Sequence, residues 1–278
     1  MEIIAKKCKP LLSIITICCN QSSDIEETCE SVITQTFQDF EWIVIDGGST
    51  DGTLQKLGKY KNRIDVLISK KDNGRYHAMN KGIRIAKGKY LNFLNGGDSY
   101  FEKDTLEKIV SALCYYLKTN ANLDVLYGNA NFVYENHEIT LPAPQKLTKV
   151  FFILDNINHQ STFIKKSLFE KYGYYNEQLE IFGDYESWLL FLKNNCVFRA
   201  LDVTVVNYKA NGISSIKSKK LIMEKAGIVR NFFAPQEVDD AYFSRLSILK
   251  KIFSITNELD YKVIRILGFK IKYNYLKI

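Results

Sequence analysis

The stretch FEWIVIDGGSTDGT, Phe40–Thr53, changes character in its middle. Its first part, Glu41–Asp46, is an apolar run that ends on a carboxylate, and two glycines follow at once. A short apolar run bounded by Gly, Ser and Asp is typical of a buried strand followed by a turn. The next residues, STDGT, are of the types that begin helices. The stretch therefore predicts a strand, a turn and a helix, with Asp46 at the carboxyl end of the strand.

The same alternation continues on both sides of this stretch. Upstream, Leu11–Cys19 is a nearly continuous apolar run, as expected of a parallel strand, and Ser23 with Glu26 forms a capping box that opens a helix. Downstream, a strand, a helix and a strand are predicted over 64–69, 74–88 and 89–95, and a strand with a hairpin over 124–141. This rhythm predicts a doubly wound α/β sheet.

The C-terminal part differs from the rest in charge. Residues 217–278 hold 13 Lys and Arg against 6 Asp and Glu, whereas residues 1–216 hold 25 of each. The whole net charge of +7 therefore lies in the last part of the chain. We predict a domain over residues 1–215 and a basic, aromatic-rich, mostly helical extension over 216–278. Its first helix is expected to bury a stripe of Ile222, Ala226, Val229 and Phe233.

Several classes of protein are disfavoured by missing motifs. There is no G-x-x-x-x-G-K-[ST] loop, no G-x-G-x-x-G after a strand and no G-x-S-x-G elbow. The six cysteines form no C-x-x-C pair, and free thiols in a reducing cytoplasm are expected. No apolar run approaches the roughly 20 residues that span a bilayer, and we interpret the N-terminal apolar stretch as a strand rather than a signal peptide.

Polar residues follow three of the predicted strands: Asn20, Asp46 and the segment Asn95–Asp98. Turn formation alone would explain each of them, because Gly, Ser, Asn and Asp are the usual turn residues. In open α/β sheets, however, ligands bind beyond the carboxyl ends of the strands. Their convergence on that edge favours a ligand site.

The combination SIITICCN, FEWIVIDGGSTDGT, NGRYHAMNKGIRIAKGKYLNFLNGGD and GDYESWL, in this order, resembles the family-2 glycosyltransferases. The resemblance covers about residues 10–215 and is closest to the members that assemble bacterial surface polysaccharides such as capsule or lipopolysaccharide. It implies a GT-A, Rossmann-like fold with a mixed central sheet, and an inverting transfer of a hexosyl or N-acetylhexosaminyl group from a nucleotide sugar.

The resemblance also assigns residues to the donor nucleotide sugar. Asp46 lies where relatives bind the base, and its carboxylate suits the N3–H of uracil, which favours a UDP-sugar. Arg75 is placed to pair with the diphosphate, although a solvated cation is nearly as well supported. His77 replaces an Asp of the family and receives no role. The donor positions are Cys18, Asn20, Asp46, Gly47, Gly74, Arg75, Asn80, Asn95, Gly96 and Gly97.

Two carboxylates are assigned to the chemistry. Asp98 takes the last position of the family's D-x-D motif and is expected to hold Mg²⁺ or Mn²⁺ together with the donor diphosphate. Asp184 takes the Asp of a Glu-Asp motif in which Gly183 replaces the Glu, and it is expected to be the general base. On local grounds alone, Asp184 could equally be a helix cap. His159, Glu186 and Trp188 are candidates for the acceptor, with packing favoured for Trp188.

The sequence thus predicts an inverting, metal-dependent glycosyltransferase with a lipid-linked or oligosaccharide acceptor and no nucleic-acid partner. We expect it in the cytoplasm, with the basic extension either on the inner face of the membrane, in a homodimer, or packed on the domain. The alternative is a nucleotide-sugar-binding module without transfer activity, because Gly96, Gly97, Gly183 and His77 depart from the family pattern. A nucleotidyltransferase is disfavoured, since the first strand is not followed by a Gly-rich basic loop.

Overall fold

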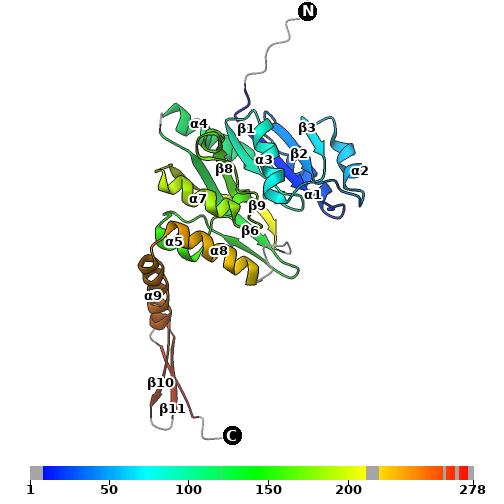
Figure 1. Ribbon diagram of the computed structural model, residues 1–278. Coiled ribbons are helices and arrows are strands. Elements are labelled where there is room, and N and C mark those ends of the chain that lie inside the picture. The colour runs from blue at the N-terminus through cyan, green and yellow to red at the C-terminus, as the bar shows by residue number, and fades with distance from the viewer. Residues whose placement is uncertain (1–8, 120, 211–218, 259–260, 267–268, 275–278) are drawn as a thin grey trace, which may run out of the picture. The chain divides into compact units, whose positions relative to one another are not determined.

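The computed structural model describes residues 9–119, 121–210, 219–258, 261–266 and 269–274 (Figure 1). Its first half alternates strands and helices in the order that the sequence predicts. The elements are β1 (Leu12–Cys18), α1 (Ile25–Ile33), β2 (Glu41–Asp46), α2 (Thr53–Leu57), the 3₁₀ turn η1 (Gly58–Tyr60), β3 (Val66–Ser69), α3 (Arg75–Ile85), β4 (Tyr90–Phe93), β5 (Ser99–Tyr100) and α4 (Thr105–Lys118).

The second half is mixed, as expected, and includes the predicted hairpin. The elements are β6 (Val125–Val133), β7 (Glu138–Leu141), α5 (Lys149–Leu154), η2 (His159–Ser161), β8 (Thr162–Lys165), α6 (Ser167–Tyr172), α7 (Gly183–Lys193), β9 (Phe198–Lys209), α8 (Lys219–Phe232), α9 (Pro235–Ile252), β10 (Phe253–Glu258), β11 (Tyr261–Ile266) and β12 (Phe269–Asn274). The hairpin is the antiparallel pair of β6 and β7.

The central sheet is mixed, in agreement with the predicted fold class. Its strands follow the order β3-β2-β1-β4-β8-β6-β9-β5, and β7 pairs with β6. β1 pairs in parallel with both β2 and β4, whereas β8 runs antiparallel to β4. The chain proceeds from β1 outward through β2 and β3 and then returns to the other side of β1. This change of direction between β1 and β4 is the topological switch point at which α/β sheets bind ligands.

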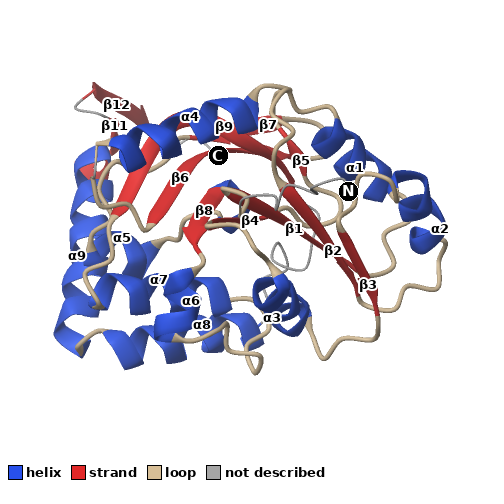
Figure 2. Ribbon diagram, turned by 90° about the horizontal axis from the view of Figure 1, so that it is seen from above, coloured by secondary structure: helices blue, strands red, loops and turns tan. Residues whose placement is uncertain are grey.

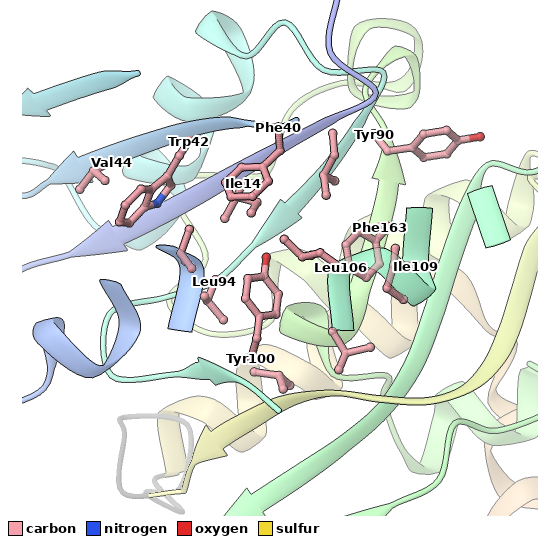
Figure 3. Close-up of a cluster of buried hydrophobic side chains, with 14 of the residues drawn as sticks. Ile14, Phe40, Trp42, Val44, Tyr90, Leu94, Tyr100, Leu106, Ile109 and Phe163 are labelled. Atoms are coloured by element: carbon pink, nitrogen blue, oxygen red, sulfur yellow. The ribbon is translucent and has the colours of Figure 1, made fainter. Parts of the chain in front are cut away.

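Helices cover both faces of this sheet (Figure 2). On one face, α1 and α4 pack on β1 and β2 through an apolar cluster that includes Ile14, Trp42 and Ile109, all fully buried (Figure 3). Trp42 satisfies its indole by donating from Nε1 to Thr16 Oγ1 at 3.1 Å. On the other face, α3 lies so close to β1 that a Cβ at Gly82 would be 2.5 Å from Ile15 Cγ2. Burial on both faces explains the continuous apolar run of β1.

The chain divides into two compact units. One runs to Leu147 and continues from Ile157 to Ala226; the other comprises Thr148–Asn156 and the chain from Gly227 onward. The boundary between the two units therefore falls within α8, and the first half of α8 belongs to the unit that contains the central sheet. The predicted division at residue 215 stays a prediction. In the second unit α5 packs with α9, joined by the ion pair of Lys149 with Glu237 at 2.6 Å.

The C-terminal extension differs from the prediction in two respects. The segments Phe253–Glu258, Tyr261–Ile266 and Phe269–Asn274 form the antiparallel sheet β10-β11-β12 rather than helix. In α8 the expected stripe is partly wrong: Val229 and Phe233 are buried, but Ile222 is 65% exposed, and Leu221 and Ile228 are buried instead. No helix in the described part of the chain is long and apolar enough to cross a membrane.

Candidate active site

The carboxyl ends of β1, β2 and β4 bring together three of the predicted segments. Cys18 at the end of β1 lies opposite Asp46 at the end of β2, and Gly47 N donates to Cys18 O at 2.8 Å. The loop after β4 joins them, because Gly96 N donates to Ile17 O at 2.9 Å. The predicted convergence at the switch point is therefore present in the structure.

Asp46 is fully buried and holds the turn that follows it. Its carboxylate accepts hydrogen bonds from the backbone amides of Gly48 and Ser49, at 3.1 and 3.0 Å, and from the hydroxyls of Ser49 and Ser69. Burial raises the pKa of Asp46, but these donors outweigh it and leave the pKa below its usual value. Both oxygens are thus engaged within the protein, and the contact of Asp46 with a nucleotide base stays a prediction.

Asn20 ties the loop after β1 to the loop after β2. It adopts a left-handed backbone, with φ of 50°, a conformation that Asn tolerates better than most residues. Its backbone N donates to Ser49 Oγ at 2.7 Å, and its Oδ1 accepts from Thr50 N at 2.9 Å. Next to it, Cys19 is exposed. Asn20 is therefore placed as a loop anchor at the rim of the switch point.

The two glycines before Asp98 have separate reasons to be glycine. A Cβ at Gly96 would lie 2.1 Å from Gln21 Oε1, because Gln21 reaches across and donates from Nε2 to Gly96 O at 2.7 Å. Gly97 has a φ of 96°, which side chains rarely adopt. At Gly96 the nearest atom belongs to the end of the Gln21 side chain, whereas at Gly97 the backbone conformation itself favours glycine.

Asp98 is 5% exposed, and among the described residues its carboxylate accepts from an amide side chain and a backbone N–H. Oδ2 accepts from Gln160 Nε2 at 2.9 Å, and Oδ1 accepts from the backbone N of Lys209 at 3.1 Å. Burial raises the pKa of Asp98 to about 6, although these two hydrogen bonds act in the opposite direction. Nearby, Asn95 Oδ1 is buried and has no hydrogen-bond partner among the described residues.

These two side chains supply the kind of ligand that Mg²⁺ and Mn²⁺ prefer. Carboxylate and amide oxygens suit hard cations, and Mg²⁺ is often held by one or two carboxylates completed by phosphate oxygens and water. Among the described residues no group of three or more His, Cys, Asp and Glu could hold a metal. The residues present therefore fit a cation that a diphosphate helps to bind, with Asp98 as its single carboxylate.

Asp184 is also buried, in the first turn of α7, and it is held from two sides. Its Oδ2 lies 3.3 Å from His159 Nδ1, and its Oδ1 lies 3.2 Å from the Tyr76 hydroxyl oxygen. His159 Nε2 lies 3.1 Å from Asn95 Nδ2. With this amide as the donor, Nε2 accepts, so Nδ1 carries the proton that faces Asp184. The predicted base is thus linked through His159 to the loop that carries Asp98.

Tyr76 explains the absence of a Glu before Asp184. A Cβ at Gly183 would lie 2.8 Å from two carbons of the Tyr76 ring. The Tyr76 hydroxyl also bonds to the carbonyl of Ile181 and accepts from the Asp184 backbone N at 3.3 Å. The ring of Tyr76, on α3, therefore occupies the space next to Gly183, and the Tyr76 hydroxyl fixes the beginning of α7.

Other predicted residues have different surroundings. Asn80 is buried and uses its amide on the backbone of Tyr175 and on Glu177, so it organises that loop. Arg75, at the start of α3 after Gly74, is half-buried and has no bonded partner among the described residues. Glu186 is half-buried, and burial raises its pKa.

Trp188 is fully buried, with its ring packed edge-on against Phe191 and Phe198. A sugar platform needs an exposed ring face, which Trp188 lacks. Trp188 is part of the core, as the favoured packing role predicts. The sequence also offers Ser214 and Ser215, on a predicted loop, as contacts of the pyrophosphate. Both lie outside the described residues.

Sequence reasoning missed three residues that shape the site: Tyr76, Gln160 and Glu224. Gln160 lies beside His159 on η2 and holds Asp98, while Glu224 on α8 accepts the backbone amides that precede α7. Tyr76 lies inside the motif NGRYHAMNKG, and Gln160 directly follows the candidate residue His159. Glu224 carries no local signal, because its partners lie some 40 residues away in the chain.

Comparison with known proteins identifies the family. The profile of Glycosyl transferase family 2 matches residues 13–173. A PGL/p-HBAD biosynthesis glycosyltransferase of Mycobacterium bovis (strain BCG / Pasteur 1173P2) is 29% identical over 207 residues, which are 73% of this chain and 78% of that protein. The putative teichuronic acid biosynthesis glycosyltransferase TuaG of Bacillus subtilis (strain 168) is 27% identical over 248 residues, or 85% and 92% of the two chains.

Solved structures share the fold. S. aureus TarS 1-349 in complex with UDP-GlcNAc has a TM-score of 0.63 at 19% identity, covering 86% of this chain and 72% of that one. The mannosyltransferase PcManGT from Pyrobaculum calidifontis, in complex with GDP-Man and Mn²⁺, has a TM-score of 0.60 at 16% identity, covering 86% and 69%. This likeness confirms the expected GT-A fold, and with the family profile it shows that the chain is a glycosyltransferase that belongs to family 2.

Proposed function

We propose that this glycosyltransferase moves a sugar from a UDP-sugar to a hydroxyl group of a growing cell-surface polysaccharide, with inversion at the anomeric carbon. One observation carries the proposal: two consecutive residues of η2 hold the two predicted acids. His159 lies 3.3 Å from Asp184, and Gln160 donates to Asp98 at 2.9 Å. The structure thereby gathers a candidate base and a candidate metal ligand that lie far apart in the chain.

In this mechanism Asp184 takes the proton of the acceptor hydroxyl as its oxygen bonds to the anomeric carbon. The bond from that carbon to the diphosphate breaks on the opposite face, and UDP leaves. His159 and the Tyr76 hydroxyl hold the carboxylate in place. Asp98 and Asn95 would hold Mg²⁺ or Mn²⁺, which neutralises the charge that develops on the diphosphate. Arg75, free of protein partners among the described residues, is available to the same diphosphate.

The names of similar proteins support a nucleotide sugar as the donor. TarS has been solved with UDP-GlcNAc, and PcManGT with GDP-Man and Mn²⁺. TuaG is named for teichuronic acid biosynthesis, and the mycobacterial relative for PGL/p-HBAD biosynthesis. A surface polysaccharide on a lipid-linked acceptor is consistent with both names.

The test uses the full chain, a panel of UDP-, GDP- and dTDP-sugars with and without Mn²⁺, and a lipid-linked glycan extract as acceptor. We expect UDP release that depends on Mn²⁺ and on the acceptor. Asp184→Asn should bind the donor as tightly as the wild type but lose transfer by at least a hundredfold, whereas Asp104→Asn, an exposed acid outside the site, should leave the rate unchanged. Donor binding without any UDP release would instead support the nucleotide-sugar-binding module.

We further propose that the basic C-terminal part binds the anionic inner face of the cytoplasmic membrane. The support is its charge: residues 217–278 hold 13 Lys and Arg but only 6 Asp and Glu. Each Lys or Arg near an anionic membrane surface contributes about 1 kcal/mol to the free energy of binding. Sedimentation with phosphatidylglycerol vesicles tests it, comparing the wild type with Lys262→Glu/Lys270→Glu/Lys272→Glu. Weaker binding by the variant is expected; equal binding by both would contradict the proposal and leave packing or a homodimer.

A further inference from the structure

Glu224, on the first half of α8, contacts the segment that leads into α7. Its Oε2 accepts from the backbone N of Glu180 at 2.8 Å, and its Oε1 accepts from the backbone N of Ile181 and Phe182 at 2.9 and 2.7 Å. One carboxylate thus receives three consecutive amides. Hydrogen bonds from amides to a charged acceptor are roughly twice as strong as neutral ones, so this contact fixes the course of the segment.

These three amides lie immediately before α7, and only the last of them belongs to its N-cap residue, Phe182. α7 begins at Gly183, and no side chain of its own N-cap residue bonds there. The negative charge of Glu224 lies at the positive end of the α7 dipole, which favours it. Glu224 therefore fixes, from a different element, the segment that leads into α7, and Asp184 is the second residue of that helix.

The peptide of Ile181 is held on both sides. Its N–H donates to Glu224, and its carbonyl accepts from the Tyr76 hydroxyl. The same hydroxyl contacts Asp184 Oδ1 at 3.2 Å. A continuous chain of contacts therefore runs from Glu224 through the Ile181 peptide and Tyr76 to the carboxylate of Asp184.

Other residues of α8 contact the same region but not this chain of contacts. Lys220 pairs with the Glu180 carboxylate, and the Lys220 side chain is 75% exposed. Lys225 Nζ lies 5.1 Å from the centre of the Tyr185 ring. Exposed ion pairs contribute little, so Lys220 offers a matched control on the same helix and the same loop.

We infer that Glu224 is a positioning residue for the base, so that α8, outside the stretch matched by the family profile, completes the active site. The inference rests on the proposed role of Asp184. It assigns to the C-terminal part of the chain a role in turnover that is independent of any membrane. Because misplacement of a reacting group by about 1 Å can cost on the order of a hundredfold in rate, loss of Glu224 should lower kcat.

The test is a graded series measured on the full chain. Glu224→Gln keeps one acceptor oxygen and Glu224→Ala keeps none, so we expect kcat to fall several-fold in the first and on the order of 10–100-fold in the second. The KM for the donor should stay within twofold in both. Lys220→Ala should keep the wild-type kcat. A wild-type kcat in Glu224→Ala, or a fall in kcat equally large in Lys220→Ala, would overturn the inference.

Amide hydrogen exchange provides a readout that needs no activity. In the wild type the amides of Glu180, Ile181 and Phe182 should be protected, and in Glu224→Ala they should lose protection while β1 and α3 keep theirs. Unchanged protection at these three amides would overturn the inference even if the sugar donor is wrongly assigned. Conversely, lost protection in a chain that transfers no sugar would uphold the contact and refute the proposed function alone.

Discussion

Burial disfavours the ionised form of a carboxylate, and at Asp98 this effect outweighs the hydrogen bonds and the nearby charges of His159 and Lys209. The pKa of Asp98 rises from 3.8 to about 6 on folding because burial disfavours the charged form. Folded protein therefore binds this proton more tightly than unfolded protein between these pH values. The resulting stabilisation, on the order of 3 kcal/mol, is present below about pH 4 and is lost as the pH rises through 6.

A divalent cation should reverse this loss, because it binds the ionised carboxylate. With UDP present throughout, we expect the increase in melting temperature caused by Mn²⁺ to be small at pH 5 and to grow through pH 7. Scanning fluorimetry over this range measures it. Asp98→Ala should remove the Mn²⁺-dependent part at every pH, and Asp104→Asn should keep it. An increment independent of pH, or one that survives in Asp98→Ala, would show that the cation binds elsewhere.

His159 makes a second prediction at the residue scale. Its Nδ1–H faces Asp184, so His159→Ala should lower kcat at least tenfold with little change in the KM for the donor. Asn can present an amide N–H near the position of Nδ1, and His159→Asn should recover part of the rate. Steady-state kinetics of the three proteins decide the matter. Equal rates for the Ala and Asn variants would mean that the hydrogen bond to Asp184 is not what counts.

At the scale of elements, the sequence predicts well wherever burial follows a local period. β1 and β2 were predicted because both are buried on both faces and so read as continuous apolar runs. In α8 the stripe was misplaced by about one position, since adjacent apolar residues such as Leu221 and Ile222 allow neighbouring stripes. The strands β11 and β12 were missed, although FKIKYN in β12 alternates apolar and polar residues with the period of a strand.

The close packing of α3 on β1 can be tested by adding a single methyl group at Gly82. A Cβ at Gly82 would lie 2.5 Å from Ile15 Cγ2, inside a fully buried layer. Gly82→Ala should therefore cost about 1–3 kcal/mol from overpacking, offset by about 1 kcal/mol of helix propensity. The melting temperature should fall. Gly227→Ala in α8, where a Cβ meets nothing within 4 Å, should raise it slightly. A rise in Gly82→Ala would contradict the close packing.

At the scale of the whole molecule, the fold was predictable but the connections between distant residues were not. Asp98 and Asp184 could be found from motifs, and the switch point from the order of strands. The contacts that hold them come from other elements: Gln160 and His159 from η2, and Tyr76 from α3. No periodicity or spacing predicts such pairs, because they depend on how the elements pack in three dimensions.

The position of Glu224 has a consequence for how the C-terminal part can be removed. A chain that ends at residue 216 follows the predicted domain boundary but lacks α8, and its amides at 180–182 lose their acceptor. We expect its kcat on a soluble acceptor to fall at least tenfold. A chain that ends at residue 252 keeps Glu224 and α9 and loses only β10–β12, which pair among themselves in the described part of the chain.

The chain that ends at residue 252 should therefore keep its kcat on the soluble acceptor within about threefold of the wild-type value. Initial rates at matched enzyme concentrations compare it with the chain that ends at residue 216. If vesicles speed up the wild type but not the chain ending at 252, the basic strands act on membrane binding and α8 acts on turnover, as two separable roles. If the chain ending at 216 turns over at the wild-type rate, the domain is catalytically complete at residue 216, and the contact of Glu224 with residues 180–182 has no part in the reaction.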